Sequence, residues 1–158
     1  MKQDHPDRSE QTPLRAHAAG RAAPLDALLP GLVATLRAQL PNLLAVYLFG
    51  SHAKGMAHAA SDIDLAVRVA GKVDPLRLWD LAQPLALRAD CDVDLVDLRA
   101  ASTVMQYQVV TTGPRLWECD AQAAIYESMI LSEKTELDTA RAGLLSDIQR
   151  RGTVYGRE

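Results

Sequence analysis

The stretch LLAVYLFGS, residues 43–51, decides the fold of this chain. Its first seven residues form an unbroken apolar run, which is typical of a strand covered on both faces. Gly50 ends the run and Ser51 opens a sharp turn, so a helical turn is expected to begin there and to end at Gly55. The sequence therefore predicts a buried central strand over residues 43–49 that leads directly into the Gly50-Ser51 turn.

Residues 61–69, SDIDLAVRV, alternate between polar and apolar types, which predicts a second strand with one exposed face. Side chains two apart on a strand share a face, so Asp62 and Asp64 present two carboxylates while Ile63 enters the core. Ten residues separate Ser51 from Asp62. Two neighbouring carboxylates repel each other unless a cation lies between them, and sites rich in oxygen suit Mg²⁺.

The Gly50-Ser51 turn is a candidate phosphate site. Backbone N–H groups and the Ser51 hydroxyl can receive an anion at such a turn, and Gly50 lets the ligand approach the backbone closely. Lys54 could reach the terminal phosphates as a point charge. A phosphate-binding turn that faces two carboxylates is the apparatus of metal-assisted phosphoryl or nucleotidyl transfer, in which two ions hold the attacking and leaving oxygens.

That chemistry needs a third carboxylate, and residues 92–97 predict a third strand that carries three candidates. Asp92 and Asp94 share one face of this strand, whereas Asp97 points to the other face and lies at the strand end. We choose Asp94, the central one, with Asp92 as the second candidate.

Helices flank these strands. Apolar residues recur at helical spacing over residues 26–40, and Pro30-Gly31 is expected to split that helix or delay its start. Asp74-Pro75 is a cap followed by proline, which predicts a helix running toward Arg88 with a kink at Pro84.

The C-terminal part predicts a short fourth strand over residues 114–118 and a long helix capped by Asp120. The order helix, strand, strand, helix, strand, helix indicates one small domain of the α/β or α+β class. One apolar stripe on the long helix is either core or a partner surface, and it comprises Leu137, Ala140, Leu144, Leu145 and Ile148.

Composition limits the possible functions. At 158 residues and 17.2 kDa the chain can bury one core, which disfavours a second domain. A net charge of -3 lacks the basic excess of nucleic-acid binders, and an aromatic content of 4% leaves few rings for base stacking. Direct binding to nucleic acid is therefore not expected.

The chain is expected to have polar tails at both ends, over residues 1–23 and 153–158, around a folded domain over residues 24–152. Cys91 and Cys119 are too few for a disulfide framework or a zinc site. The N-terminus lacks the apolar core of a signal peptide, and no window has the length of a membrane span, so we expect a cytoplasmic protein without membrane association.

Several other side chains are expected to have structural roles only. His52 and His58 lack further ligands and are not expected to bind metal. Tyr47 lies in an apolar strand and is expected in the core, and Trp79 and Trp117 are expected to pack against apolar faces.

The string Gly50-Ser51, ten residues, Asp62-x-Asp64, with Asp94 on a later strand, resembles the polymerase-beta-type nucleotidyltransferases, in particular the minimal nucleotidyltransferases of the MntA antitoxin type. The resemblance covers residues 26–150. It implies a polymerase-beta-like fold, a small mixed sheet flanked by helices with a long C-terminal helix. The turn GSHAKG departs from the arginine-containing turn that is commoner in the family, since Lys54 keeps the positive charge but not the forked geometry of arginine.

The resemblance also implies an activity, a partner and roles for the site residues. Members bind Mg²⁺-ATP and transfer AMP to a tyrosine of a HEPN-domain RNase toxin, which neutralises the toxin. Gly50 and Ser51 would hold the triphosphate, with Lys54 beside them. Asp62 and Asp64 would bind two Mg²⁺ ions, and Asp94 would bind one of them and act as the general base.

Two alternatives remain open at this point. The chain could neutralise a partner by binding and occlusion, with a vestigial nucleotide site. It could also be a nucleotidyltransferase of the type that modifies small molecules such as aminoglycosides, although such enzymes need more chain to enclose the acceptor.

Overall fold

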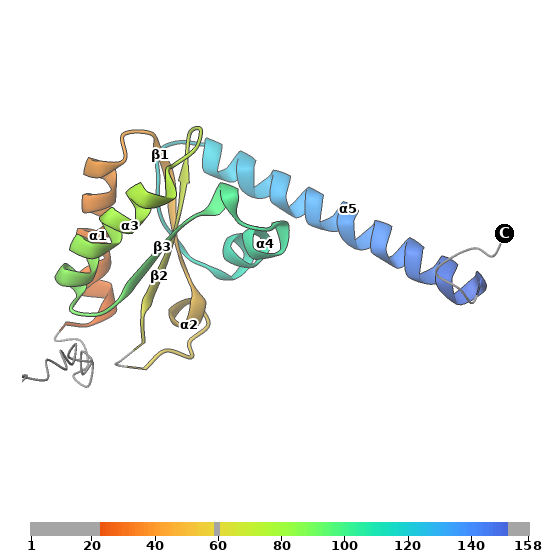
Figure 1. Cartoon of the computed structure of the whole chain (residues 1–158), viewed down its shortest axis with the longest axis horizontal. Coiled ribbons are helices and arrows are strands. Elements are labelled where there is room, and N and C mark those ends of the chain that lie inside the picture. Colours follow the sequence, from red (N-terminus) through yellow and green to blue (C-terminus); the bar gives the residue numbers. More distant parts are fainter. Residues whose placement is uncertain (1–22, 59–60, 152–158) are drawn as a thin grey trace, which may run out of the picture.

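A four-stranded sheet of order β3-β2-β1-β4 forms the centre of the computed structural model, which describes residues 23–58 and 61–151 (Figure 1). β1 pairs antiparallel with β2 and with β4, whereas β2 and β3 run parallel. The elements in chain order are α1 (Leu25–Gln39), β1 (Leu43–Phe49), α2 (Gly50–Ala53), β2 (Ile63–Val69), α3 (Pro75–Ala89), β3 (Val93–Asp97), the 3₁₀ turn η1 (Leu98–Ala100), α4 (Thr103–Thr112), β4 (Arg115–Glu118) and α5 (Gln122–Arg151).

Helices cover both faces of the sheet, and an apolar core lies on each face. α1 and α3 lie on one side, and α4 and the first turns of α5 lie on the other (Figure 1). Each predicted strand forms within two residues of its expected bounds, and the mixed sheet with flanking helices confirms the predicted α/β architecture. The predicted tails over residues 1–23 and 153–158 lie outside the described residues, apart from residue 23.

β2 differs from the prediction of a strand with one exposed face. Ala66 is fully buried, and Asp64 and Arg68 on the same face are half-buried. Tertiary packing explains this burial, because α4 and α5 cover the face of β2 that carries the polar residues. The Arg68 guanidinium lies 4.8 Å from the centroid of the Tyr126 ring of α5, which lets a charged side chain lie beneath a helix.

The two helices on the opposite face form as the caps and periodicity indicated. α1 continues through Pro30 without a break, so the expected split or delay at Pro30-Gly31 is wrong. α3 begins at Pro75 after the Asp74 cap, whose carboxylate accepts a hydrogen bond from the Leu76 N–H at 2.9 Å. α3 is the crossover that the parallel pair β2 and β3 requires.

α4 has no counterpart among the predicted elements. Six of its ten residues are Thr or Val, β-branched types that favour strands. This composition explains why the sequence did not predict a helix here. The Ser102 hydroxyl accepts a hydrogen bond from the Met105 N–H at 3.2 Å, and Gly113 follows the last residue. The cap and the glycine are the local signals that could have found it.

α5 is 30 residues long, and only its first turns pack on the sheet, through Ala123, Tyr126 and Ile130. The rest of the helix extends away from the body (Figure 1). The apolar stripe on it is therefore not part of the core of this chain, since Leu137, Leu144 and Leu145 are 42%, 62% and 55% exposed. None of the helices described has the length and apolarity of a membrane span.

Tyr47, buried as expected, ties the centre of the sheet to α5. Its hydroxyl donates to Glu127 Oε1 at 2.8 Å, and Arg115 donates to the same oxygen at 2.7 Å. Burial is the largest cause that raises the pKa of Tyr47, followed by its hydrogen bond to Glu127, so the phenol remains neutral. The hydrogen bond to Glu127 thus satisfies the Tyr47 hydroxyl, a polar group that lies inside an apolar strand.

Tyr47→Phe is expected to lower the free energy of unfolding by about 1 kcal/mol, because one hydrogen bond is lost and little volume changes. Urea unfolding measures this value. Combining Tyr47→Phe with Glu127→Gln in a double-mutant cycle provides the control, and strictly additive losses would contradict the proposed coupling between the two side chains.

Candidate active site

Gly50 is the residue at which β1 leads into α2, and the structure leaves no room for a side chain there. Its φ of +71° lies in the left-handed region that favours glycine. A Cβ at this position would overlap the Asp64 carboxylate, since the Asp64 Cγ would lie 2.9 Å away. The turn is therefore packed directly against a candidate metal ligand, and α2 begins at Gly50, one residue before the start expected at Ser51.

Sheet register brings the turn and the carboxylates together. The antiparallel pairing of β1 and β2 sets Phe49 opposite Asp64, so Gly50 follows beside that aspartate. The parallel pairing of β2 and β3 sets Asp64 beside Asp94 on the same face. Gly50, Asp64 and Asp94 therefore lie side by side at three adjacent strands, although 43 residues separate the first from the last in sequence.

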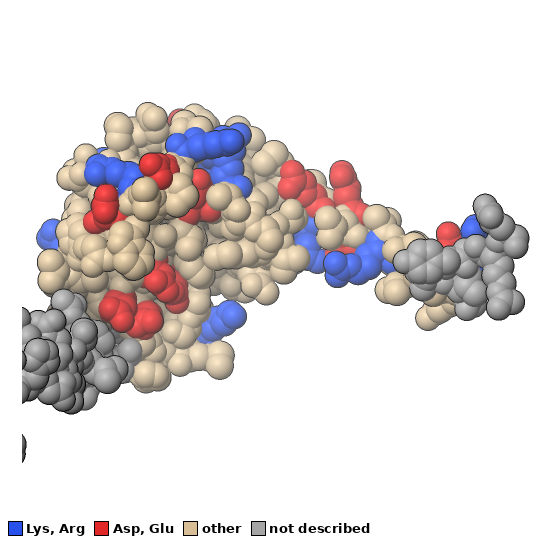
Figure 2. Space-filling view, viewed as in Figure 1, with Lys and Arg blue, Asp and Glu red and all other residues tan. Residues whose placement is uncertain are grey.

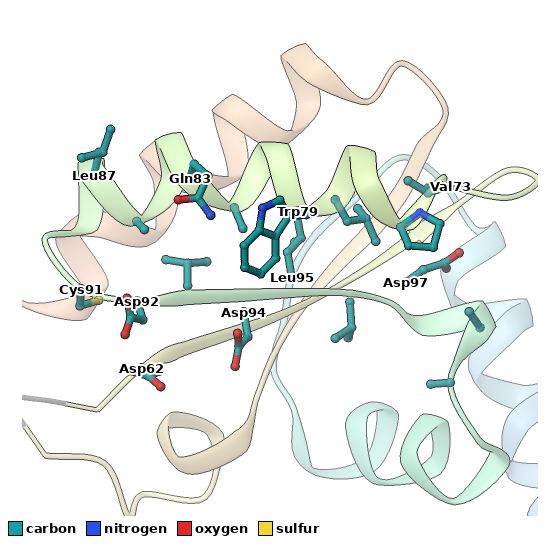
Figure 3. A pocket seen from close by; sticks show the side chains of 18 of the residues that line it. Asp62, Val73, Trp79, Gln83, Leu87, Cys91, Asp92, Asp94, Leu95 and Asp97 are labelled. Atoms are coloured by element: carbon teal, nitrogen blue, oxygen red, sulfur yellow. The ribbon is translucent and has the colours of Figure 1, made fainter. Parts of the chain in front are cut away.

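The remaining acidic candidates lie at different places. Asp62 is exposed just before β2 and points to the same side of the sheet as Asp94 and Asp92 (Figure 3). Asp97 lies at the far end of β3, where its carboxylate accepts the Arg99 N–H at 3.0 Å (Figure 3). The structure thus brings Asp62, Asp64 and Asp94 together, with Asp92 next to them and Asp97 apart.

The three carboxylates repel one another. Burial is the first cause that raises the pKa of Asp64 to about 6, followed by the charges of Asp94 and Asp62 and a hydrogen bond shared with Asp94. Figure 2 shows acidic side chains gathered on this part of the surface, beside α2. A cation would relieve that repulsion, and an all-oxygen donor set fits Mg²⁺.

The side chains as they lie do not yet enclose a cation. Among the described residues, no three His, Cys, Asp or Glu side chains lie close enough together to hold a metal ion.

The raised pKa of Asp64 gives the stability of the metal-free protein a pH dependence of defined sign. The folded state binds the proton more tightly than the unfolded chain does, in which the carboxyl titrates near 3.8. The stabilisation from Asp64 is therefore complete below that pH and is lost as the pH rises through about 6. Urea unfolding in EDTA at a series of pH values measures the decline.

Asp64→Asn is the matched control for this pH series, since it keeps the shape of the side chain and removes the titrating group. Other carboxylates titrate in the same range, so the difference between the two proteins is the informative quantity. That difference is expected to change through about pH 6. Parallel curves for the two proteins would contradict the assignment.

Lys54 is exposed at the C-terminal end of α2, one residue before Gly55, whose φ is +68°. Within residues 23–58 and 61–151, no hydrogen bond or ion pair holds the Lys54 side chain in place. Gly55 follows the last turn of α2, as the sequence indicated.

The sequence did not reveal a groove of 890 Å³ that runs between α3 and β3 as far as Asp62 and Asp94 (Figure 3). Trp79, expected to pack against an apolar face, lines this groove and is 68% exposed, so that expectation is wrong. Trp117 is half-buried as expected, with Arg37 lying 4.9 Å from its ring centroid. Within the described part of the chain, neither Cys91 nor Cys119 forms a disulfide.

Comparisons with known proteins agree with this geometry. A family model described as polymerase beta, nucleotidyltransferase, matches residues 32–122, which include both carboxylate strands and the glycine turn. Protein adenylyltransferase MntA of Shewanella oneidensis is 44% identical to this chain over 103 residues, which are 65% of this chain and 74% of that protein.

Solved structures give the same result. A toxin-antitoxin crystal structure with AMP-PNP matches with a TM-score of 0.68 and 40% identity, covering 77% of this chain and 98% of that one. The MNT antitoxin structure in complex with the tri-AMPylated Shewanella oneidensis HEPN toxin matches with a TM-score of 0.64 and 37% identity, covering 78% and 98%.

Proposed function

This chain belongs to the polymerase beta nucleotidyltransferase family, and on that premise we propose that it is an antitoxin that transfers AMP from ATP to a HEPN-domain toxin and thereby neutralises it. The observation that carries the proposal is the convergence of Gly50, Asp64 and Asp94. The similarity to an adenylyltransferase and to complexes with AMP-PNP and with an AMPylated HEPN toxin supports the same activity.

Each site residue takes a role that its position allows. The backbone N–H groups at Gly50 and Ser51 and the Ser51 hydroxyl bind the triphosphate, because first-turn N–H groups of a helix point outward without an intrahelical partner. Lys54 adds a positive charge near the terminal phosphates. Asp62, Asp64 and Asp94 hold Mg²⁺, with two ions expected in all. When bound, the ions neutralise the phosphate oxygens and the charge of the leaving group.

The transfer step balances as a simple displacement. The acceptor hydroxyl, which we take to be a tyrosine of the toxin, gives its proton to Asp94 as the general base. Its oxygen forms a bond to the α-phosphorus of ATP, and the bond from that phosphorus to the bridging α,β-oxygen breaks. Pyrophosphate leaves with the electron pair of the broken bond, and Asp94 passes its proton to solvent.

The proposal is tested with ATP labelled at the α-phosphate, Mg²⁺ and the HEPN-domain protein encoded with this chain. Label is expected on the HEPN protein with the wild-type enzyme and not with Asp62→Ala/Asp64→Ala. Absence of transfer by the wild type, or undiminished transfer by the double variant, would remove the proposed activity.

The two alternative functions give different outcomes in the same assay. If the double variant still abolishes the RNase activity of the toxin at equal concentration, binding and occlusion are sufficient. Label on an aminoglycoside instead of the protein would indicate a small-molecule enzyme. The proposed function also implies a cytoplasmic location beside the toxin, which fractionation of cells would test.

A further inference from the structure

The groove between α3 and β3 adjoins the carboxylates, and most of its lining residues have no role in the proposed ATP site. Its volume of 890 Å³ is large enough for several residues of a bound segment. One wall is α3, with Leu78, Trp79 and Ala82, and the floor is β3. The lining continues to Asp94 and Asp62, so a segment lying in the groove would end at the site of AMP transfer (Figure 3).

β3 offers a free edge along this groove. It pairs with β2 on one side, and among the described residues no strand pairs with its other side. The Ile63 N–H donates to the Asp92 carbonyl at 2.9 Å, and a parallel ladder then uses the backbone groups of Asp94 and Val96. The N–H and C=O groups of Val93 and Leu95 consequently point outward, where an added strand could pair with them.

The alternation of side chains along β3 determines which residues an added strand would contact on each face. Val93 and Leu95 direct their side chains toward α3, whereas Asp94 directs its carboxylate to the opposite face of the sheet. Successive side chains of a segment paired with this edge would therefore point in turn into the groove under α3 and toward Asp94 on the other face. One hydroxyl-bearing residue of such a segment would thus lie beside the proposed general base.

Trp79 and the charge of the groove indicate the chemistry of the segment. Trp79 is 68% exposed and hangs from α3 toward Leu95, an arrangement typical of an aromatic anchor at an interface (Figure 3). Besides the proposed metal ligands Asp62 and Asp94, the groove is lined by Asp90, Asp92 and Asp97 and, among the described residues, by no Lys, Arg or His. Charge complementarity therefore favours a basic segment.

We propose that the groove between α3 and the free edge of β3 receives an extended, basic segment of the acceptor protein as an added strand, which places the acceptor hydroxyl beside Asp94. The inference rests on the proposed function for the identity of the acceptor. Main-chain pairing supplies affinity in this mode, and the alternate side chains supply specificity.

Hydrogen exchange of the full-length chain, with and without the HEPN-domain protein, tests strand addition directly. The amides of Val93 and Leu95 are expected to become protected in the complex, while the loop amide of Gly71 is unchanged. This readout does not depend on chemistry. A wild type that transfers no AMP but gains this protection would remove the proposed function and keep the groove as a binding site, whereas a stable complex without protection would overturn the inference.

Trp79→Ala tests the anchor kinetically, because it removes the indole and adds no charge to the groove. It is expected to raise the KM for the HEPN protein by about tenfold or more, with AMP-PNP binding and kcat unchanged. Leu76→Ala on the same helix is the matched control, because Leu76 is 71% exposed and lies outside the groove. Equal effects of the two variants, or none from Trp79→Ala, would overturn the inference.

Asp90→Asn tests the charge of the segment and preserves the left-handed φ of 53° at this position, which asparagine tolerates. A several-fold rise in the KM for the HEPN protein is expected, and added salt should reduce the difference from wild type. An unchanged KM at low salt would contradict a basic segment next to Asp90.

Discussion

Replacing Asp64 by asparagine is expected to reduce AMP transfer to the HEPN protein on the order of 10³-fold, because the reaction loses a charge that acts directly on the metal and phosphate groups. Asp64 lies between Gly50 and Asp94, so no neighbouring carboxylate can take its place without moving a strand. Single-turnover transfer of labelled AMP at saturating ATP measures the loss.

The same substitution separates chemistry from folding. Asparagine ends the repulsion with Asp62 and Asp94, so above about pH 6 the metal-free variant is expected to be at least as stable as wild type. Mg²⁺ should raise the melting temperature of the wild type more than that of the variant. An inactive variant that is also unfolded, or an active one, would contradict the assignment of Asp64 to the site.

Gly50→Ala is the second substitution with a large expected effect. The new methyl group meets the Asp64 carboxylate, and the residue must also adopt a φ of +71°. The left-handed backbone costs about 1 kcal/mol for alanine, and the overlap adds to it by displacing either the turn or the carboxylate. We expect AMP transfer to fall by about 10² to 10³-fold, since both phosphate binding and metal binding depend on that contact.

Gly55→Ala is the matched control for Gly50→Ala. Gly55 has a similar φ of +68°, but a Cβ there meets nothing within 4 Å among the described residues. It should therefore lose about 1 kcal/mol of stability and retain most of its activity. Urea unfolding and AMP-PNP titration of both variants measure the two effects. Equal losses of activity would show that backbone strain alone, and not the contact with Asp64, explains the first variant.

Local signals in the sequence were sufficient for the strands and for most of the candidate site. The apolar run of β1, the glycine after it and the Asp62-x-Asp64 spacing each depend on neighbours within a few residues. The choice of Asp94 over Asp97 also followed from the two-residue period of a strand. The register of β2 against β3, which sets Asp64 beside Asp94, agrees with that choice.

Features that depend on packing between elements distant in the sequence could not be predicted from local signals. Leu78 and Trp79 are adjacent apolar residues of α3, yet the first is 6% exposed and the second 68%. Leu78 shares the buried stripe of α3 with Leu81 and Leu85, whereas the groove that leaves the Trp79 indole exposed depends on the position of β3. The burial of Ala66 likewise depends on α4 and α5, which pack over β2 from later in the chain, and α4 itself was hidden by its β-branched composition.

The parallel pairing of β2 and β3 has a consequence for how the length of this chain can change. An insertion in the connection between α3 and β3 would be absorbed at the surface. Deletion of one residue within β3 would instead turn every following side chain to the opposite face, so that a valine or leucine would replace the carboxylate beside Asp64. Natural and engineered length variation should therefore concentrate in the connections and spare these strands.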